Sequence, residues 1–367
     1  MKPYSLQELE KCGFLSKMFG STPAENGWKE LNNLLAEAPD ALALTSEDVK
    51  GALKKWGVKF NDDNLAQRSG VYRKLADVIF TDVQSKDDSL FKQIEHLAEL
   101  LELPAYQVKL ADKASKTAAY FVRCRNILSG EEKLDIQQLN ALFDYDYEDS
   151  LAMRKQVFKA HFNQKFDGIS KAQRYTPEEE ASFTADCTAL NLTLAEELKP
   201  NIKSALDKYR NLWNAEHNPL GNIQQDAFPL NAGEVCHAYT NCGLCQNKMV
   251  EREDNYFELT RKFSIDETVS FKNEKIEHPK FKEEMIILLE LGAFFLTNQR
   301  IVYIGKKNAF NVMLANITNA DFDGVNLITF HTINSQKENV DVIIKFSDEA
   351  AGVMFILFNK AFANAKA

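Results

Sequence analysis

Several features that would assign the chain to a common class are missing from its sequence. No apolar run approaches the roughly 20 residues that a transmembrane helix needs, and Met1–Glu10 is polar and acidic, unlike a signal peptide. Lysine and arginine form no dense cluster and the net charge is −9, which argues against a nucleic-acid binder. The P-loop, GxGxxG, GxSxG and HExxH motifs are also absent. We therefore expect a cytoplasmic protein that is not an enzyme and does not bind nucleic acid.

Cysteine is scarce, with six residues in the chain. Cys12, Cys124 and Cys187 stand apart in segments with helical character, and the other three cluster between residues 236 and 245. Isolated cysteines of this kind are typical of free, buried thiols in a reducing compartment. This use of cysteine favours the cytoplasm over a secreted, disulfide-bonded fold.

A helix-start signal recurs in the first 213 residues. Ser or Thr is followed three residues later by Asp or Glu, so the hydroxyl can cap a free backbone N–H and the carboxylate suits the positive end of the helix. An apolar segment with helical spacing follows each signal. The four occurrences are TSED at 45–48, SKDD at 85–88, SGEE at 129–132 and TPEE at 176–179, at intervals of 40, 44 and 47 residues.

This spacing predicts units of helix, acidic turn and helix that bury their apolar faces against one another in a compact bundle. The acidic turns have two interpretations: they cap helices, or they hold a divalent cation. The EF-hand pattern fails in loops that start at Asp82 and at Asp144, because the sixth position is not Gly and the twelfth is not Glu. A looser cation site made of Asp82, Asp87 and Asp88 stays open as a hypothesis.

The segment YRKLADVIFTDVQSKDDSLFKQIEHLAELLEL at 72–103 contains a helix that ends in an acidic turn, then a capping signal and an apolar helix that ends near LEL. The segment TPEEEASFTADCTALNL at 176–192 echoes it. Over residues 70–200 this pattern resembles the TerB-like helical repeats of tellurite-resistance and stress-related proteins. The resemblance implies a cytoplasmic helical module linked to metal or stress response. The metal-binding residues of that family are not matched, so none is carried over.

The chain changes character after the segment NAEHNPLGNIQQDAFPLNAG at 214–233, whose two Pro and two Gly are typical of a linker. Short stretches rich in β-branched and aromatic residues follow and predict seven or eight strands, two of them at 256–265 and 268–274. A very apolar helix is expected at 348–365, with Ser347 as its cap. Strands followed by one such helix are typical of a small barrel that the helix closes at one end.

The segment LGAFFLTNQRIVYIGKKNAFNVMLANITNADFDGVNL at 291–327 contains a strand that ends in Leu-Thr-Asn-x-Arg and, later, an Asp-Gly-aliphatic run. NAGEVCHAY at 231–239 fits a Gly-Glu start of the first strand. Over residues 230–362 this pattern resembles the GRAM and bacterial PH-like superfamily. The resemblance implies binding of anionic lipid headgroups, phosphopeptides or partner proteins, not catalysis. The matching residues are Leu296, Thr297, Asn298, Arg300, Gly305, Ile317, Asp323 and Gly324.

Arg300, Lys306 and Lys307 are candidate contacts for an anion such as a phosphate. In the alternative interpretation, the two lysines are solvated at a hairpin tip and Arg300 pairs with a carboxylate to hold its strand. Residues 231–367 contain 15 Lys and Arg against 18 Asp and Glu. Because anionic membranes attract basic surfaces, we expect a protein partner ahead of a membrane surface.

Cys236, His237, Cys242 and Cys245 are four soft side chains in CHAYTNCGLC, and Cys242-x-x-Cys245 has zinc-knuckle spacing. They predict a zinc site or a thiol redox role, and zinc is the one cofactor that the sequence suggests. Against this prediction, Cys236 and His237 are adjacent, so on a strand they point to opposite faces. The alternative is that the cysteines are small apolar residues near a turn and that the protein has no cofactor.

The sequence thus predicts a two-domain α+β protein. An all-α bundle occupies residues 1–213, a linker 214–232, and a PH-like β-barrel or sandwich capped by a C-terminal helix 233–367. We expect a binding or adaptor protein in which the barrel presents a strand edge or loop to a partner and the helical region docks or senses stress. The alternative function is a divalent-metal-responsive sensor that uses the acidic turns or the cysteine cluster. No oligomeric state is predicted.

Overall fold

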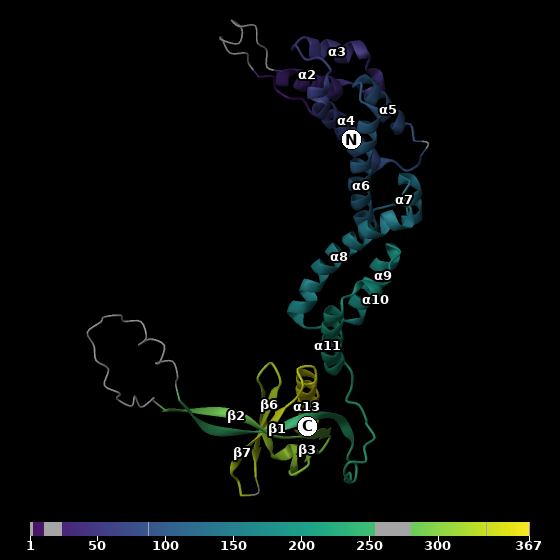
Figure 1. Cartoon of the computed structure of the whole chain (residues 1–367). Helices are drawn as coiled ribbons and strands as arrows, with labels where there is room; N and C mark the ends of the chain where they lie inside the picture. Colours follow the sequence, from purple (N-terminus) through teal and green to yellow (C-terminus); the bar gives the residue numbers. More distant parts are fainter. Residues whose placement is uncertain (1–2, 11–23, 87, 254–279, 335, 367) are drawn as a thin grey trace, which may run out of the picture. The chain divides into compact units, whose positions relative to one another are not determined.

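The structure is a computed structural model that describes residues 3–10, 24–86, 88–253, 280–334 and 336–366 (Figure 1). The chain divides into two compact units. The helical unit comprises residues 1–171 and 177–200, and the sheet unit comprises residues 172–176 and 201–367. The predicted two-domain α+β organisation is confirmed, since helices precede a seven-stranded antiparallel sheet and a C-terminal helix.

The helical unit alternates long and short helices. Contacts join α2 to α3, α4 to α5 and α6 to α7, and the long helices α4 and α6 pack on each other. None of the helices in the described ranges combines the length and the apolar character needed to cross a membrane. The elements are α2 (Ala24–Glu37), η1 (Ala41–Ala43), α3 (Ser46–Lys54), η2 (Asp62–Asn64), α4 (Leu65–Asp82), α5 (Leu90–Leu100), α6 (Ala105–Ser129), α7 (Ile136–Phe143), α8 (Tyr147–Ala172), α9 (Pro177–Ala189) and α10 (Leu194–Glu197).

The four short helices α3, α5, α7 and α9 are followed by the same turn. A residue with positive φ comes after each helix, and the next N–H donates to the carbonyl oxygen five positions back, as in a Schellman motif. The positive-φ residues are Gly57, Glu102, Asp144 and Asn191, at intervals of 45, 42 and 47 residues. An aliphatic or aromatic residue flanks each of them on both sides. These turns define a structural repeat whose most regular element is the end of the short helix.

Two arginines clamp the second and fourth of these turns. Arg68 of α4 donates to the carbonyl oxygens of Leu101 and Glu102 at 3.1 and 2.8 Å. Arg154 of α8 donates to those of residues 190 and 191 at 2.9 and 3.1 Å. Each guanidinium also donates to a carbonyl seven residues earlier and lies 5.0 Å from the centroid of an aromatic ring. The clamp is therefore the same contact made twice in one unit.

The predicted helix starts have mixed outcomes. The capping box between Thr45 and Asp48 is confirmed at the start of α3. The SGEE signal is wrong as a helix start, because Ser129 is the last residue of α6 and Gly130 ends that helix with a positive φ. The next helix, α7, begins only after Asp135, which forms a capping box of its own.

The strands of the sheet unit follow the order β4-β3-β2-β1-β7-β6-β5, so β4 and β5 lie at the two edges. The predicted strands at 256–265 and 268–274 lie outside the described residues. The elements are α11 (Pro200–His217), β1 (Cys236–Glu253), β2 (Lys280–Thr297), β3 (Arg300–Gly305), β4 (Ala309–Met313), η3 (Leu314–Asn316), β5 (Ile317–Phe322), β6 (Leu327–Ile333), β7 (Asn339–Lys345) and α13 (Ala351–Lys366).

One apolar core takes side chains from all seven strands and from α13. Because both edge strands contribute to it, the sheet curves around this core. α13 covers it with Met354, Phe358 and Ala361, and the Phe358 ring meets that of Phe330 edge-on at 4.9 Å. Ser347 lies before the helix, and its Oγ accepts the N–H of Ala350 at 3.3 Å.

The segment predicted as a linker, 214–232, packs on the sheet. α11 continues to His217, so the first residues of the segment are helical, and α11 belongs to the sheet unit. Leu220 packs against the main core, and the ring of Phe228 meets that of Phe295 edge-on at 5.2 Å. The N–H of Ile223 donates to the carbonyl of residue 236 at 2.8 Å. Apolar side chains within the Pro/Gly-rich stretch therefore fasten it to the strands.

Candidate functional site

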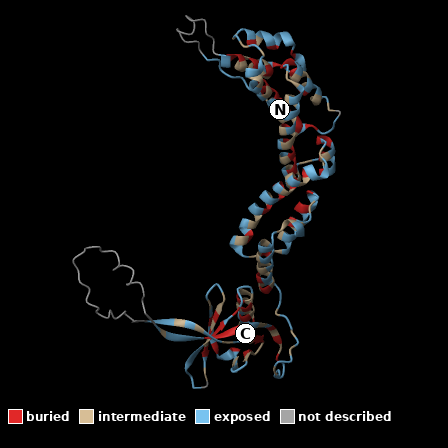
Figure 2. Cartoon of the chain, in the orientation of Figure 1, coloured by how far each residue is buried: buried red, intermediate tan, exposed pale blue. Residues whose placement is uncertain are grey.

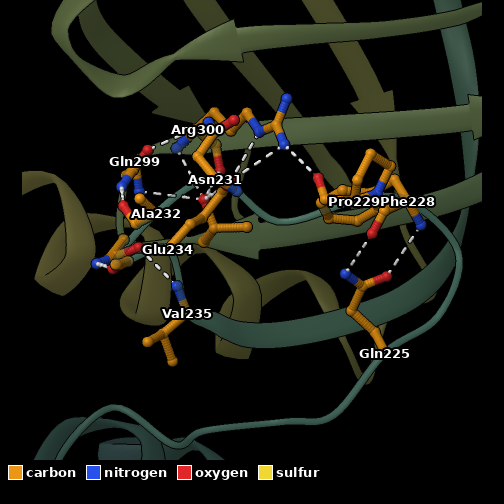
Figure 3. Close-up of polar contacts among 12 residues, drawn as sticks. Gln225, Phe228, Pro229, Asn231, Ala232, Glu234, Val235, Gln299 and Arg300 are labelled. Carbon is orange, nitrogen blue, oxygen red and sulfur yellow. Dashed lines mark hydrogen bonds and ion pairs between the residues drawn. The ribbon is translucent and has the colours of Figure 1, made fainter.

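Arg300, the first predicted site residue, lies at the start of β3 and is held by a carboxylate (Figure 3). Its Nε donates to Oε1 of Glu234 at 2.8 Å, and its Nη2 donates to Oε2 of the same residue at 3.0 Å. Nη2 also donates to the carbonyl oxygen of Pro229 at 2.9 Å. A two-bond contact between guanidinium and carboxylate fixes both side chains in one geometry. Arg300 therefore fastens residues 229–234 to the start of β3.

Glu234 is the buried partner of this pair, with 0% of its side chain exposed. The Thr297 hydroxyl donates to Oε1 and the Asn231 N–H donates to Oε2, both at 2.8 Å. Burial opposes ionisation of this carboxyl, but these donors and the Arg300 guanidinium outweigh it and hold the pKa of Glu234 below its usual value. The charge of Arg300 is thus compensated, which favours its interpretation as a strand-holding residue over an anion contact.

Lys306 and Lys307 lie in the turn after β3, at the other end of that strand from Arg300. A six-residue strand spans about 20 Å, so the three predicted anion contacts do not converge. Glu290 accepts the N–H groups of Lys307 and Asn308 at 2.9 and 2.8 Å. These bonds hold the pKa of Glu290 below its usual value. An ionised carboxylate therefore lies directly beneath the turn, where it disfavours a bound anion.

The four predicted metal ligands on β1 point in different directions. A register shift makes His237 an extra residue on the strand, and its Nδ1 lies 2.6 Å from the carbonyl oxygen of Gly221. Cys236 belongs to a small cluster on one face of the sheet, whereas Cys242 lies in the main core on the other face. A second shift, between Leu244 and Cys245, lies between the two cysteines of the Cys-x-x-Cys spacing.

Metal binding finds no support in the part of the chain that the structure describes. Within it, no group of three or more His, Cys, Asp and Glu side chains could hold a metal ion, in the acidic turns or elsewhere; Asp87 lies outside it. Burial raises the pKa of the Cys236, Cys242 and Cys245 thiols, to about 12 for Cys242. Protonated thiols are poor ligands and poor nucleophiles. The geometry favours the interpretation of these cysteines as small apolar residues.

The sequence did not predict a long two-stranded ribbon at one side of the sheet. β1 and β2 have 18 residues each and pair along their whole length. β3 pairs with β2 only over residues 292–296, and β7 pairs with β1 only over 243–245. We call the remainder, Gln246–Glu253 and Lys280–Leu291, the ribbon; both of its outer edges lack a neighbouring strand among the described residues (Figure 1).

One face of the ribbon, which we call the outer face, is apolar and exposed. Gly243 and Leu288 lie on it together, since a Cβ on Gly243 would lie 2.4 Å from Leu288 Cδ1. Alternation along the strands puts Ile286 and Met249 on the same face, and Leu291 pairs directly with Gly243. The exposed fractions are 54% for Leu288, 47% for Ile286, 57% for Met249 and 73% for Leu291. Most of the described ribbon has the colour of exposed residues in Figure 2. Exposed apolar side chains gathered on one face are typical of interaction surfaces.

The signal for the ribbon was present in the sequence as EMIILLELGAFFLT, residues 284–297. Strands of globular proteins usually have five or six residues, so an apolar run more than twice as long predicts a strand that continues beyond its sheet. The expectation from sequence treats this run as one strand among several, so it does not predict that the edges of the ribbon lack partner strands among the described residues.

Comparison with known proteins adds no family to this geometry. A scan of the chain against models of protein families gives no match. A search of curated proteins finds no similar sequence. The assignment of function therefore depends on the geometry of the sheet unit.

Proposed function

We propose that the protein is a non-enzymatic binding and adaptor protein, whose sheet unit is a PH-like domain that binds a partner protein by strand addition. The observation that carries this proposal is the ribbon, in which Gln246–Glu253 and Lys280–Leu291 each pair on one side only among the described residues. Unpaired edges present rows of N–H and C=O groups to solvent. An extended segment of another protein can satisfy these groups by pairing with an edge of the ribbon.

The contacts of the Leu-Thr-Asn-x-Arg motif support the PH-like assignment. The Thr297 hydroxyl donates to Glu234 and accepts the N–H of Arg300 at 2.9 Å. The Asn298 Oδ1 accepts the N–H of Val235 at 2.9 Å, and its amide donates to the Gly233 carbonyl at 3.0 Å. The motif thereby joins the turn between β2 and β3 to the Gly-Glu start of β1. This is a physical reason for the two motifs that carry the resemblance to occur together.

A protein partner fits the charges of the sheet unit better than an anionic lipid does. Acidic residues outnumber basic ones over residues 231–367. Arg300 is compensated by Glu234, and Glu290 lies beneath the Lys306–Lys307 turn. Anionic membranes hold proteins through uncompensated basic surface. Lipid headgroups are therefore the second candidate ligand.

The helical unit has an exposed apolar surface of its own, which in this proposal binds a second protein. Tyr106 and Leu110 lie one turn apart near the start of α6 and are 64% and 63% exposed. Residues four positions apart on a helix share one face, so the two form a small apolar surface. In the proposal this TerB-like unit docks a second protein or senses stress while the sheet unit binds its own partner.

The experiment compares three tagged forms of the protein as baits in cell extract. The first is the natural chain. In the second, residues 248–285 are replaced by Asn-Gly, a hairpin turn that joins the paired residues Asn247 and Ile286 and removes most of the ribbon. In the third, only residues 254–279 are replaced by a short flexible linker, so the ribbon stays. Captured proteins are identified by mass spectrometry.

We expect at least one protein to be captured by the first and third chains and lost from the second. The same proteins on all three baits, or a loss already in the third, would contradict strand addition at the ribbon. In a parallel arm, vesicles that contain phosphatidylserine are sedimented with the natural chain. Cosedimentation of the chain in this arm, without ribbon-dependent capture, would assign the sheet unit to lipid instead.

A further inference from the structure

A hollow at the base of the outer face combines apolar walls with a nearby positive charge. The hollow has a volume of about 590 Å³, and its lining includes Gly243, Leu288, Leu291, Gly292 and Lys345. The Leu288 side chain lies over Gly243, and Leu288 and Leu291 give the hollow apolar walls. Asn241, Lys345 and Ser347 also line it, so the hollow is a partly apolar recess with one cation.

Met249 is the apolar projection on the same face. It is six residues from Gly243 on β1, which is about 20 Å along a strand, and 57% of it is exposed. Methionine is flexible and adapts to irregular recesses better than branched side chains do. A recess and a projection of matching chemistry therefore lie on one face of one strand.

We propose that the outer face of the ribbon is the contact between two copies of this chain. When two outer faces meet with β1 strands antiparallel, a two-fold axis midway between Gly243 and Met249 puts each Met249 at the other copy's hollow, against Leu288 and Leu291. Both insertions occur at once, because a two-fold contact uses the same patch on each copy. Ile286 and Leu288 lie near the axis and pack against their counterparts.

Charge supports the antiparallel orientation. Lys345 borders the hollow, where it pairs in register with Gly243. Among the side chains that the structure describes at the opposite end of the outer face, Glu251 and Glu284 stand against Lys282, which lies 3.9 Å from Glu251. The two ends are therefore of opposite sign, and antiparallel copies bring unlike ends together, whereas parallel copies bring like ends together.

A second copy also explains the outer face better than a bilayer does. The charged side chains of Glu251, Lys282 and Glu284 share the face with the apolar ones. Burial of these groups among lipid chains would be unfavourable, but in a two-fold contact they stay at the rim. We expect a dimer that dissociates in the micromolar range, as small transient interfaces do.

The experiment is sedimentation velocity on the full chain from low to high micromolar concentration. The natural chain is expected to shift from monomer to dimer as concentration rises. Met249→Glu and Leu291→Lys are expected to raise the dissociation constant at least about tenfold, since each puts a charge in an apolar contact. Met249→Leu is expected to stay within about threefold of the natural chain, because the volume and polarity are kept. Val325→Glu changes an equally exposed apolar residue in the turn before β6 and is the matched control, with no change expected.

A charge exchange tests the orientation. Lys345→Glu alone and Glu284→Lys alone are expected to weaken the dimer, and the two together to recover part of the loss, because the ends regain opposite signs although Lys345 and Glu284 flank β1 on opposite sides and do not pair directly. A natural chain that stays monomeric at every concentration would overturn the proposal, as would variants that all dimerise equally. A monomeric chain that sediments with phosphatidylcholine vesicles would assign the outer face to a bilayer and also overturn it.

This inference goes beyond the strand addition proposed above, and the two can fail separately. Strand addition uses the backbone of the ribbon edges, whereas the dimer uses side chains of the outer face. Met249→Glu is therefore expected to give a monomer that still captures the ribbon-dependent partner. Loss of both dimer and capture in this variant, with the fold intact by circular dichroism, would show that the outer face binds the partner and not a second copy.

Discussion

Arginine is neutralised in two ways in the two units: the clamp arginines Arg68 and Arg154 of the helical unit donate to carbonyl groups, whereas Arg300 of the sheet unit, like Arg123 of the helical unit, pairs with a carboxylate. In the helical unit, Arg68 and Arg154 donate to backbone carbonyls at the ends of helices. In the sheet unit, Arg300 faces the carboxylate of Glu234, whose side chain is fully buried. A helix end has only a partial negative charge, whereas a carboxylate has a full one.

The difference determines what remains when the arginine is removed. When Arg68 or Arg154 is removed, carbonyl groups lose donors but no charge is left behind. Loss of Arg300 leaves an uncompensated carboxylate in the interior, which is the more unfavourable outcome. Arg300 is therefore more sensitive to substitution than the two clamp arginines, and Arg123, which pairs with the buried Glu132, belongs with Arg300.

The largest expected effect is that of Arg300→Met. Removal of one partner of a buried pair leaves the other charge without compensation, so the sheet unit should lose about 3 kcal/mol or more of its free energy of unfolding. Peptide-resolved hydrogen exchange measures this loss for each unit separately. Protection in α2–α9 is expected to be unchanged.

The pH dependence sharpens this prediction. In the natural chain the pKa of Glu234 is lowered. The ionised carboxylate therefore stabilises the fold at pH values above its pKa in the unfolded chain, and this contribution is lost as pH falls through its pKa in the folded chain. In Arg300→Met the Glu234 carboxyl stays buried but loses the guanidinium, so its pKa should rise relative to the natural chain and the destabilisation should shrink in mild acid. The double variant Glu234→Gln, Arg300→Met should be less destabilised than Arg300→Met alone. A double variant no better than the single one would contradict the buried-charge account.

The next effect is that of Arg154→Met in the helical unit. It removes donors to the carbonyls of Leu190 and Asn191, which cannot all reach water because Arg154 itself is 0% exposed. Unsatisfied groups of this kind cost about 1–3 kcal/mol, and no charge is stranded. Arg68→Met should cost a similar amount. A loss equal to that of Arg300→Met would remove the distinction between the clamp arginines and Arg300.

A smaller effect, of opposite sign, is expected at the repeated turns. Glu102 has φ 46°, a left-handed conformation that is unfavourable for residues other than Gly, so Glu102→Gly should stabilise the helical unit by about 0.5–1 kcal/mol. The pair that Glu102 forms with Lys50 is exposed and contributes little. Gly57→Ala is the matched reverse change and should destabilise. Chemical denaturation of the full chain measures both.

The smallest effect concerns His331, which lies between two carboxylates on the sheet. Its Nε2 is 2.9 Å from Asp321 and its Nδ1 is 2.8 Å from Asp341, and these contacts raise the pKa of the imidazole. Because the pKa is raised, the contribution of the protonated imidazole to stability is complete at pH values below the pKa of His331 in the unfolded chain. This contribution is lost as pH rises through the pKa of His331 in the folded chain. The groups are partly exposed, so we expect less than about 1 kcal/mol. In His331→Gln this pH dependence should vanish from the sheet unit, and its persistence would contradict the assignment.

Local patterns in the sequence were enough to separate the two units. Helical periodicity and the β-rich stretches after residue 233 depend on neighbours a few positions away, so they could be predicted. The same holds for Thr45 as a helix cap and for the Leu-Thr-Asn-x-Arg motif as the end of a strand. Ser129 failed because Gly130, the next residue, ends the preceding helix.

The ribbon and the cysteines depended on distant neighbours. β1 loses its second partner strand after Cys245, because β7, a hundred residues later, pairs with only three of its residues. The register shifts at His237 and beside Cys245 redirect the side chains of β1, and alternation alone does not reveal them. The sequence therefore indicated which residues were unusual but not which of them would face one another.

The positive-φ turns after α3, α5, α7 and α9 have a consequence for how this chain can evolve. Each turn is closed by a hydrogen bond to a carbonyl of its own helix, so its geometry does not depend on the number of repeats before or after it. Duplication or deletion of one whole repeat would leave the remaining turns intact, while an insertion of a few residues inside a helix would shift its apolar face. Descendants of this gene can therefore change the length of the helical unit in whole modules and keep the sheet unit unaltered.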